Sequence, residues 1–248
     1  MKGYFLLLVL LYCNLEVTAQ EIQSLVFSGG KNFVGKDVIQ VEYGLNFERQ
    51  IKSISSIDQQ ISQYALVKYG VNKGLDFSLT YNYAREQIFV SDQMRRSNGL
   101  SNLAAGFKKK ISRNFSFQSN VGFSQDENGR TLGSFQIFGI SEHPIDNYLT
   151  WENNLGINWA NGSPEANLMY LSGITFSVPY PMDFILEIYG QYGRAAWNNY
   201  TNLGLGYYFT ADLMLEAYVG YGNTLNQQNT FFSLNVYWRL VPARYFEE

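Results

Sequence analysis

The amino-acid sequence predicts an all-β protein, an up-and-down antiparallel transmembrane β-barrel of about twelve strands. Three observations predict this fold. Apolar and polar residues alternate over segments of about 9 to 11 residues, the period of two that is typical of strands with one apolar and one polar face. Short and long connections alternate along much of the chain. Aromatic residues make up 17% of the chain and charged residues only 16%, and no segment is apolar enough for a membrane helix.

Residues 1–19 have the pattern of a secretory signal peptide. Met1 and Lys2 give a positive start, residues 4–12 are apolar, and Val17 and Ala19 provide compact residues before a cleavage site. The apolar run is too short for a membrane anchor, which needs about 20 residues. Because the one cysteine, Cys13, lies in this segment, the mature chain has no disulfide, as is typical of a bacterial envelope protein. We therefore expect export through a cleavable signal peptide.

After a lead-in, residues 20–37, the barrel is expected over residues 38–240, followed by a C-terminal tail, residues 241–248. In residues 213–222, for example, Leu, Leu, Ala, Val and Tyr occupy one face, and Met, Glu, Tyr, Gly and Gly the other. The sixth strand, residues 132–140, is the weakest because its alternation is poor. The twelve strands are centred near Tyr43, Val67, Leu79, Gly106, Phe117, Ile137, Leu155, Leu171, Ile188, Leu205, Ala217 and Val236.

The connections between these segments are of two kinds. Short ones are expected at residues 72–74, 112–114, 179–183 and 210–212, and longer polar ones at residues 49–62, 86–98, 125–130 and 224–229. Residues 142–146, which contain Pro144, also indicate a reversal of the chain, because proline cannot donate to a strand ladder. This pattern predicts a meander with tight turns at one end and loops at the other.

Two kinds of architecture bury such strands, a soluble sandwich or lipocalin-like barrel and an outer-membrane barrel. Strand length favours the membrane, and so do polar faces rich in Asn, Ser, Thr, Gln and Gly rather than Lys and Glu. Lys109 would face lipid, but it lies beside a turn, where a lysine costs only about 0–1 kcal/mol. Aromatic residues near strand ends match interface girdles: Tyr81, Tyr83, Trp151, Trp159, Tyr207 and Trp238.

The strand series resembles the family of outer-membrane proteins named for the MetA pathway of phenol degradation, which are transporter-like barrels. The resemblance covers nearly all of the mature chain and is one of pattern. It implies an outer-membrane channel or transporter, with hydrophobic or aromatic solutes as cargo, and it marks Glu42, Lys68 and Asp76 as lumen positions. It is carried by Val-Glu-Tyr-Gly at 41–44, Val-Lys-Tyr-Gly-Val at 67–71, Gly-Leu-Asp-Phe at 74–77, Ala-Gly-Phe-Lys at 105–108, Asn-Leu-Gly at 154–156, Leu-Gly-Tyr-Tyr-Phe-Thr at 205–210 and Tyr-Val-Gly-Tyr-Gly at 218–222.

The polar faces supply candidate lumen-lining residues of both charges. They could form a constriction that sets ion preference, or pair across the lumen and brace it. Inward glycines, such as Gly44 and Gly220, either leave room or mark strand bends. Inward Tyr189, Tyr218 and Tyr237 either form a slide for aromatic solutes or fill space. The candidate lumen-lining residues are Glu42, Lys68, Asp76, Lys108, Glu152, Glu187, Glu216 and Arg239.

Several function classes are not indicated. His143 is the one histidine, and our topology places it at the turn end, so a Ser–His hydrolase is not expected. A chain with one histidine and no mature cysteine is a poor zinc protein, and no Gly-rich loop opens a helix, so no metal or cofactor is expected. A net charge of −3 speaks against nucleic acid as a partner.

The expected function is that of an outer-membrane channel or transporter for passive uptake or efflux of small solutes. Its partners would be outer-membrane lipid and a small-molecule solute. The alternative is a non-conducting structural or assembly barrel in the outer membrane. The lead-in bears on this choice, because residues 21–36 could fold in as a plug, dock a periplasmic or envelope protein, or serve as a flexible lead.

Overall fold

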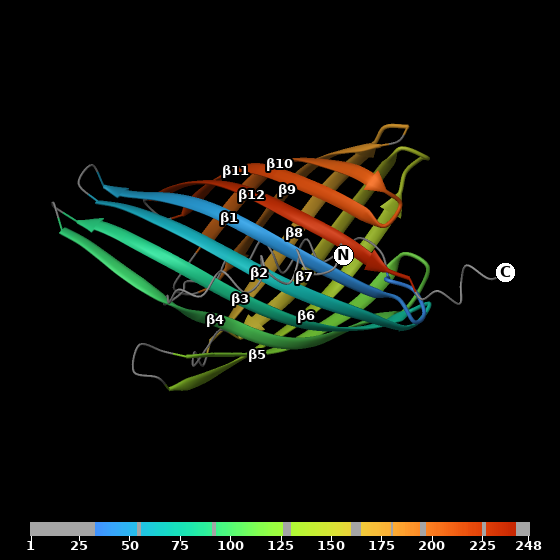
Figure 1. The fold of residues 1–248 in the computed structure, drawn as a ribbon, viewed down its shortest axis with the longest axis horizontal. Coiled ribbons are helices and arrows are strands. Elements are labelled where there is room, and N and C mark those ends of the chain that lie inside the picture. The colour runs from blue at the N-terminus through green and yellow to red at the C-terminus, as the bar shows by residue number, and fades with distance from the viewer. Residues whose placement is uncertain are drawn as a thin grey trace, which may run out of the picture.

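The computed structural model describes residues 33–53, 56–90, 93–125, 130–159, 165–179, 181–193, 197–224 and 227–241. These residues form one closed antiparallel barrel of twelve strands in up-and-down order (Figure 1). Each predicted strand centre falls within its strand, including the weak sixth, so the predicted fold is confirmed. The strands are β1 Ile39–Ser53, β2 Ser56–Asn72, β3 Leu75–Val90, β4 Gln93–Lys110, β5 Phe115–Gln125, β6 Thr131–Pro144, β7 Leu149–Trp159, β8 Ala166–Ser177, β9 Met182–Tyr192, β10 Trp197–Thr210, β11 Leu213–Thr224 and β12 Gln227–Leu240.

The barrel closes between its first and last strands. The β1 strand pairs with β12 from Ile39 opposite Leu240 to Ile51 opposite Gln228. Closure satisfies the backbone N–H and C=O groups that an open sheet edge would leave unpaired, as a wall in lipid requires. Among the described residues, no helix has the length and apolar character needed to cross a membrane.

The two ends of the barrel differ. At the turn end, tight connections follow β2, β4, β6, β8 and β10, and the chain enters β1 and leaves β12 there. Pro144 lies at the last position of β6, one residue before the connection. In that connection the Asp146 carboxylate accepts hydrogen bonds from the backbone N–H groups of Tyr148 and Leu149, at 2.7 and 2.8 Å. The predicted reversal therefore lies over residues 145–148.

The prediction of long polar loops at the opposite end is wrong in three of its four places. Most of residues 49–62 belongs to β1 and β2, which run to Ser53 and restart at Ser56. Residues 86–98 and 224–229 are likewise mostly strand. The reason is that the antiparallel ladder continues to pair backbone groups through these residues. The strands β1–β4 therefore extend the wall at this end, and they reach furthest to the left in Figure 1.

The last part of the lead-in lies against the turn end of β2 and β3. The N–H of Asp37 donates to the carbonyl of Gly70 at 2.7 Å, and the N–H of Val34 donates to an Asp76 carboxylate oxygen at 3.0 Å. Residues 33–38 thus follow the inner rim of the barrel. The predicted signal peptide, most of the lead-in and nearly all of the C-terminal tail lie outside the described residues and stay predictions.

Candidate functional site: the barrel lumen

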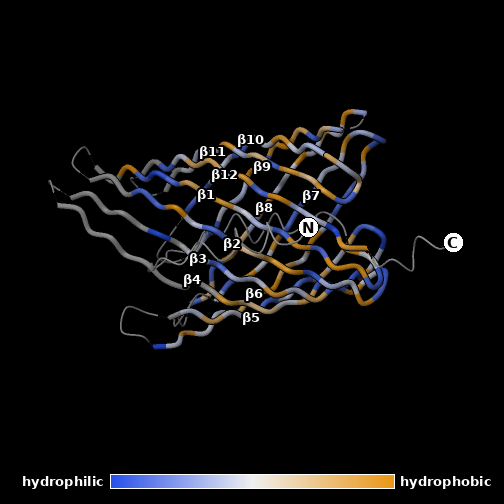
Figure 2. The backbone as a smooth tube through the Cα atoms, in the orientation of Figure 1, coloured by the Kyte–Doolittle hydropathy of each residue, from blue (hydrophilic) through white to orange (hydrophobic). Residues whose placement is uncertain are grey.

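The wall has an apolar outer face and a polar inner face. Figure 2 shows hydrophobic and hydrophilic residues alternating along the strands. On the outside, Leu155 is 59% exposed, and Val121, Leu203 and Phe232 are exposed as well. Large apolar side chains cover this face all round the barrel, which is the reverse of a soluble barrel and the arrangement that lipid requires.

Polar side chains gather on the inner face. Many of them are buried although they are polar, which is expected only if they point away from the outer surface and toward the lumen. They include Asn46, Asn158, Asn229 and Asn235, each at most 1% exposed. Cross-strand register places Asn46 opposite Ser233 and lets that serine donate to the Asn46 amide oxygen at 2.6 Å.

All eight candidate lumen-lining residues lie on this inner face by ladder register. Their role in a solute path stays a prediction. Glu42, Lys68, Asp76 and Glu216 are buried, and Lys108, Glu152 and Glu187 are half-buried. Arg239 is exposed at the end of β12.

Three of the candidates form one network near the turn end. The Lys68 ammonium pairs with the Glu42 carboxylate at 2.6 Å, with the side chains 9% and 1% exposed. The Gln40 amide donates to the same Glu42 oxygen at 2.7 Å. Arg239 donates to the Gln40 side-chain oxygen at 3.1 Å. This network joins the neighbouring strands β12, β1 and β2, where the barrel closes, so it runs along the wall. The two interpretations of the lumen charges, a constriction or pairing across the lumen, stay predictions.

A second group surrounds Lys108. Its ammonium interacts electrostatically with Glu152, Lys68, Glu142 and Asp76, which come from four other strands. Asp76 lies directly opposite Lys108 in the ladder. Charges from β2 to β7 therefore face a common space at the turn end, as a mixed-charge constriction would require.

The remaining carboxylates lie in the opposite wall. Glu187 accepts a hydrogen bond from the Asn202 amide at 2.8 Å, and Glu216 accepts one from the Tyr218 hydroxyl at 2.9 Å. Glu216 is 5% exposed. The donors in these two bonds are neutral. A neutral donor orients a carboxylate without cancelling its charge.

At five inward glycines the space that a side chain would fill is already occupied. A Cβ at Gly44, Gly156, Gly204, Gly220 or Gly222 would lie within 3.0 Å of an aromatic ring from the neighbouring strand. Each ring belongs to the residue directly opposite in the ladder, so it occupies the space that a side chain would fill. This is the arrangement in which an aromatic residue covers a strand glycine. The five pairs are Gly44–Tyr64, Gly156–Phe138, Gly204–Tyr218, Gly220–Phe231 and Gly222–Tyr200.

Sequence reasoning missed an apolar patch on the inner face. Tyr189 and Tyr200 stack with ring centroids 5.1 Å apart, and Phe231 meets Tyr200 edge-on at 6.3 Å. Tyr218, by contrast, fills the space at Gly204. The signal for the patch was present in the sixth strand, whose poor alternation arises because inward residues are apolar there too. The buried members of the patch are Phe138, Ile140, Met169, Leu171, Tyr189 and Phe231.

No group of three potential metal ligands occurs among the described residues. His143 lies near the end of β6, exposed, with its ring 6.0 Å from that of Trp151. Its Nδ1 is 3.4 Å from the Asn114 amide nitrogen.

Comparison with known proteins gives a likeness of fold. No family model and no curated protein matches the sequence. The translocator domain of the autotransporter NalP from Neisseria meningitidis is 14% identical with a TM-score of 0.62, over 87% of this chain and 92% of that domain. An outer-membrane channel from Pseudomonas putida F1 is 9% identical with a TM-score of 0.60, over 85% and 97%. The NanC porin is 11% identical with a TM-score of 0.53, over 80% and 100%. The chain therefore has the fold of outer-membrane β-barrels.

Proposed function

We propose that this protein is a passive outer-membrane channel or transporter for small solutes, hydrophobic or aromatic ones among them. The observation that carries the proposal is the inner face, which is polar and bears charges within an apolar outer wall. Two of the structural neighbours are themselves a channel and a porin, which supports the same function. We also propose that residues 1–19 direct export and that the chain belongs to the family it resembles.

Several amide groups on the inner face are buried without a hydrogen-bond partner among the described residues. These are both side-chain amide atoms of Asn158 and the amide oxygens of Asn229 and Asn235. In a dry core each such group would cost about 1–3 kcal/mol. Ordered water bound at these groups would remove that cost, which fits an inner face that is hydrated.

The charge distribution predicts a preference for cations. Glu187 and Glu216 lie in the wall opposite Lys108, where they accept hydrogen bonds from the Asn202 amide and the Tyr218 hydroxyl. The Glu42–Lys68 pair cancels its own charge and braces the wall. Tyr200, which is half-buried and stacks on the buried Tyr189, offers an apolar surface on which an aromatic solute could pack.

The test is conductance across a planar bilayer after refolding the mature chain in detergent. We expect discrete current steps that favour cations, and a weaker cation preference when Glu187→Gln and Glu216→Gln are combined. Lys109→Gln is the control, because Lys109 is exposed on the outer face and its loss changes no lumen charge.

Three results would contradict the proposal in different ways. A heat-modifiable barrel that passes no current would identify a non-conducting structural or assembly barrel. A chain that stays soluble without detergent and never enters lipid would overturn the membrane assignment. Steps with an unchanged ion preference in the double variant would remove the two carboxylates from the conducting path.

A further inference from the structure

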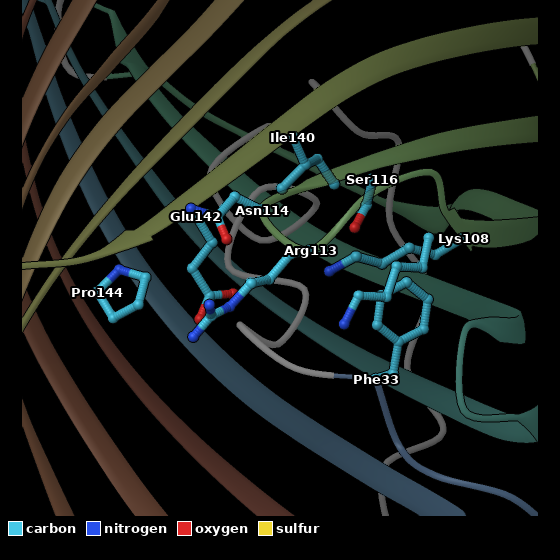
Figure 3. A pocket seen from close by; sticks show the side chains of 9 residues that line it. Phe33, Lys108, Arg113, Asn114, Ser116, Ile140, Glu142 and Pro144 are labelled. Carbon is cyan, nitrogen blue, oxygen red and sulfur yellow. The ribbon is translucent and has the colours of Figure 1, made fainter.

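A cavity of about 250 Å³ opens on the inner face at the turn end, between β4, β5 and β6 (Figure 3). Its position is set by register, because Lys108 and Lys110 alternate with outward residues of β4 and face Gln118 and Ser116 of β5. Its lining includes Phe33, Lys108, Lys110, Arg113, Ile140 and Glu142.

The cavity carries more positive than negative charge. Three cationic side chains line it, against the single carboxylate of Glu142. Lys110 and Arg113 form no ion pair with any described residue, and both are exposed on the cavity side of the mouth. Lys108 and Glu142 interact electrostatically with each other. An anion entering the cavity would therefore find two cations available and a third nearby.

The same cavity has an apolar wall. The Lys108 ammonium lies 5.2 Å from the centroid of the Phe33 ring. Ile140, which is 9% exposed, connects the cavity to the apolar patch of the lumen. Pro144 closes a further side. An apolar cavity of about 150 Å³ can hold a benzene molecule, so this one has room for an aromatic ring together with a charged group.

We propose that this cavity binds a small monocarboxylate that bears one aromatic ring. The carboxylate would receive hydrogen bonds from the Arg113 guanidinium, whose fork matches a carboxylate, and from the Lys110 ammonium. The ring would pack on Phe33 and Ile140. This inference goes beyond the proposed function: it names a ligand for a cavity at the turn end of the barrel, and it does not require that ligand to pass through the lumen.

Binding of benzoate to the refolded full chain in detergent tests the site by isothermal titration calorimetry. We expect saturable binding that weakens about tenfold or more in the double variant Lys110→Gln with Arg113→Gln, since charge-assisted hydrogen bonds are lost. The matched control is Lys73→Gln with Lys109→Gln, which removes the same net charge from a turn and from the outer face and should leave binding unchanged. Phe33→Leu should weaken binding less than the double variant, because an apolar side chain remains.

Two comparison ligands separate the two halves of the site. Benzyl alcohol keeps the ring without the charge, and sulfate keeps charge without the ring, so both should bind at least about tenfold more weakly than benzoate. Sulfate that binds as well as benzoate, or a control variant that loses as much as the test variant, would reduce the site to general anion attraction and overturn the proposal. Absence of saturable benzoate binding would overturn it as well. Conductance is measured separately, so a barrel that conducts but does not bind benzoate would refute this site and leave the channel standing.

Discussion

The pairing of lumen glycines with aromatic rings predicts how the barrel responds to a single methyl group. In Gly220→Ala the new Cβ would lie within 3.0 Å of three carbons of the Phe231 ring. Carbon atoms prefer separations of about 3.5–4.0 Å. The ring must therefore move, yet Phe231 is 9% exposed and packs in the apolar patch of the lumen.

The expected magnitude follows from two opposing effects. Overpacking a buried site costs about 1–3 kcal/mol. Alanine gains about 0.5–1 kcal/mol over glycine in a strand, because the unfolded chain loses freedom. Gly133→Ala is the matched control, since Gly133 is exposed on the outer face of β6 and a Cβ there meets nothing within 4 Å. The backbone effect cancels between the two variants, so Gly220→Ala should be about 1–3 kcal/mol less stable than Gly133→Ala.

The assay is urea unfolding of the refolded barrel in lipid vesicles, followed by tryptophan fluorescence. Both variants keep all four tryptophans of the chain, so the signal is comparable. A second comparison isolates the ring: on a Phe231→Ala background, Gly220→Ala should behave like Gly133→Ala, because the obstructing ring is gone. Equal stability of Gly220→Ala and Gly133→Ala in the native background would refute the reasoning, since the ring would then move at no cost.

Other parts of the wall give further predictions. Lys68→Met leaves the Glu42 carboxylate buried without its 2.6 Å partner and should cost about 3–5 kcal/mol of unfolding free energy in the same urea assay; adding Glu42→Gln should restore part of it, and no restoration would count against the pair. Gly70→Ala places a Cβ within 3.0 Å of the Gly35 carbonyl and should release residues 33–38 from the rim. Trypsin should then cut after Lys36 faster than in the parent protein. An unchanged cleavage rate would contradict the contact between residues 33–38 and the rim. Leu155→Arg, on the outer face at the middle of β7, should destabilise the barrel in lipid by about 2–4 kcal/mol, and a neutral result there would speak against contact with the bilayer.

Period-two alternation was sufficient to predict the fold because each strand of a membrane barrel faces two different solvents. Apolar and polar residues therefore alternate in the sequence wherever the two faces of a strand meet lipid and lumen. The prediction from alternation fails in residues 49–53 and 86–90, which we expected as loop. They pair as strand because the hairpin ladder continues through them. Hydropathy does not predict strand extensions of this kind, and only the pairing of neighbouring strands reveals them.

For the candidate site, the sequence predicted which residues lie on the inner face of the barrel but not which of them contact one another. Alternation gave the inward side of Glu42 and Lys68, but their pairing depends on which residues are neighbours across the ladder. Phe33 and Val34 contribute to the rim through contacts with Lys108 and Asp76, which are more than 40 residues away in the chain. No local pattern encodes such a contact, so sequence alone left the lead-in with three alternatives.

The glycine–aromatic pairs bear on the central question of whether twelve strands enclose a path. Barrels of eight strands are filled by their own side chains, and those of sixteen or more leave a channel. In a barrel of intermediate size, an inward ring that projected toward the axis would close the lumen. Opposite a glycine, however, the ring can lie across the neighbouring strand and fill wall space, as Phe231 does at Gly220. The rings of these pairs therefore occupy space beside the wall glycines, so a wall rich in inward rings does not by itself require a closed lumen.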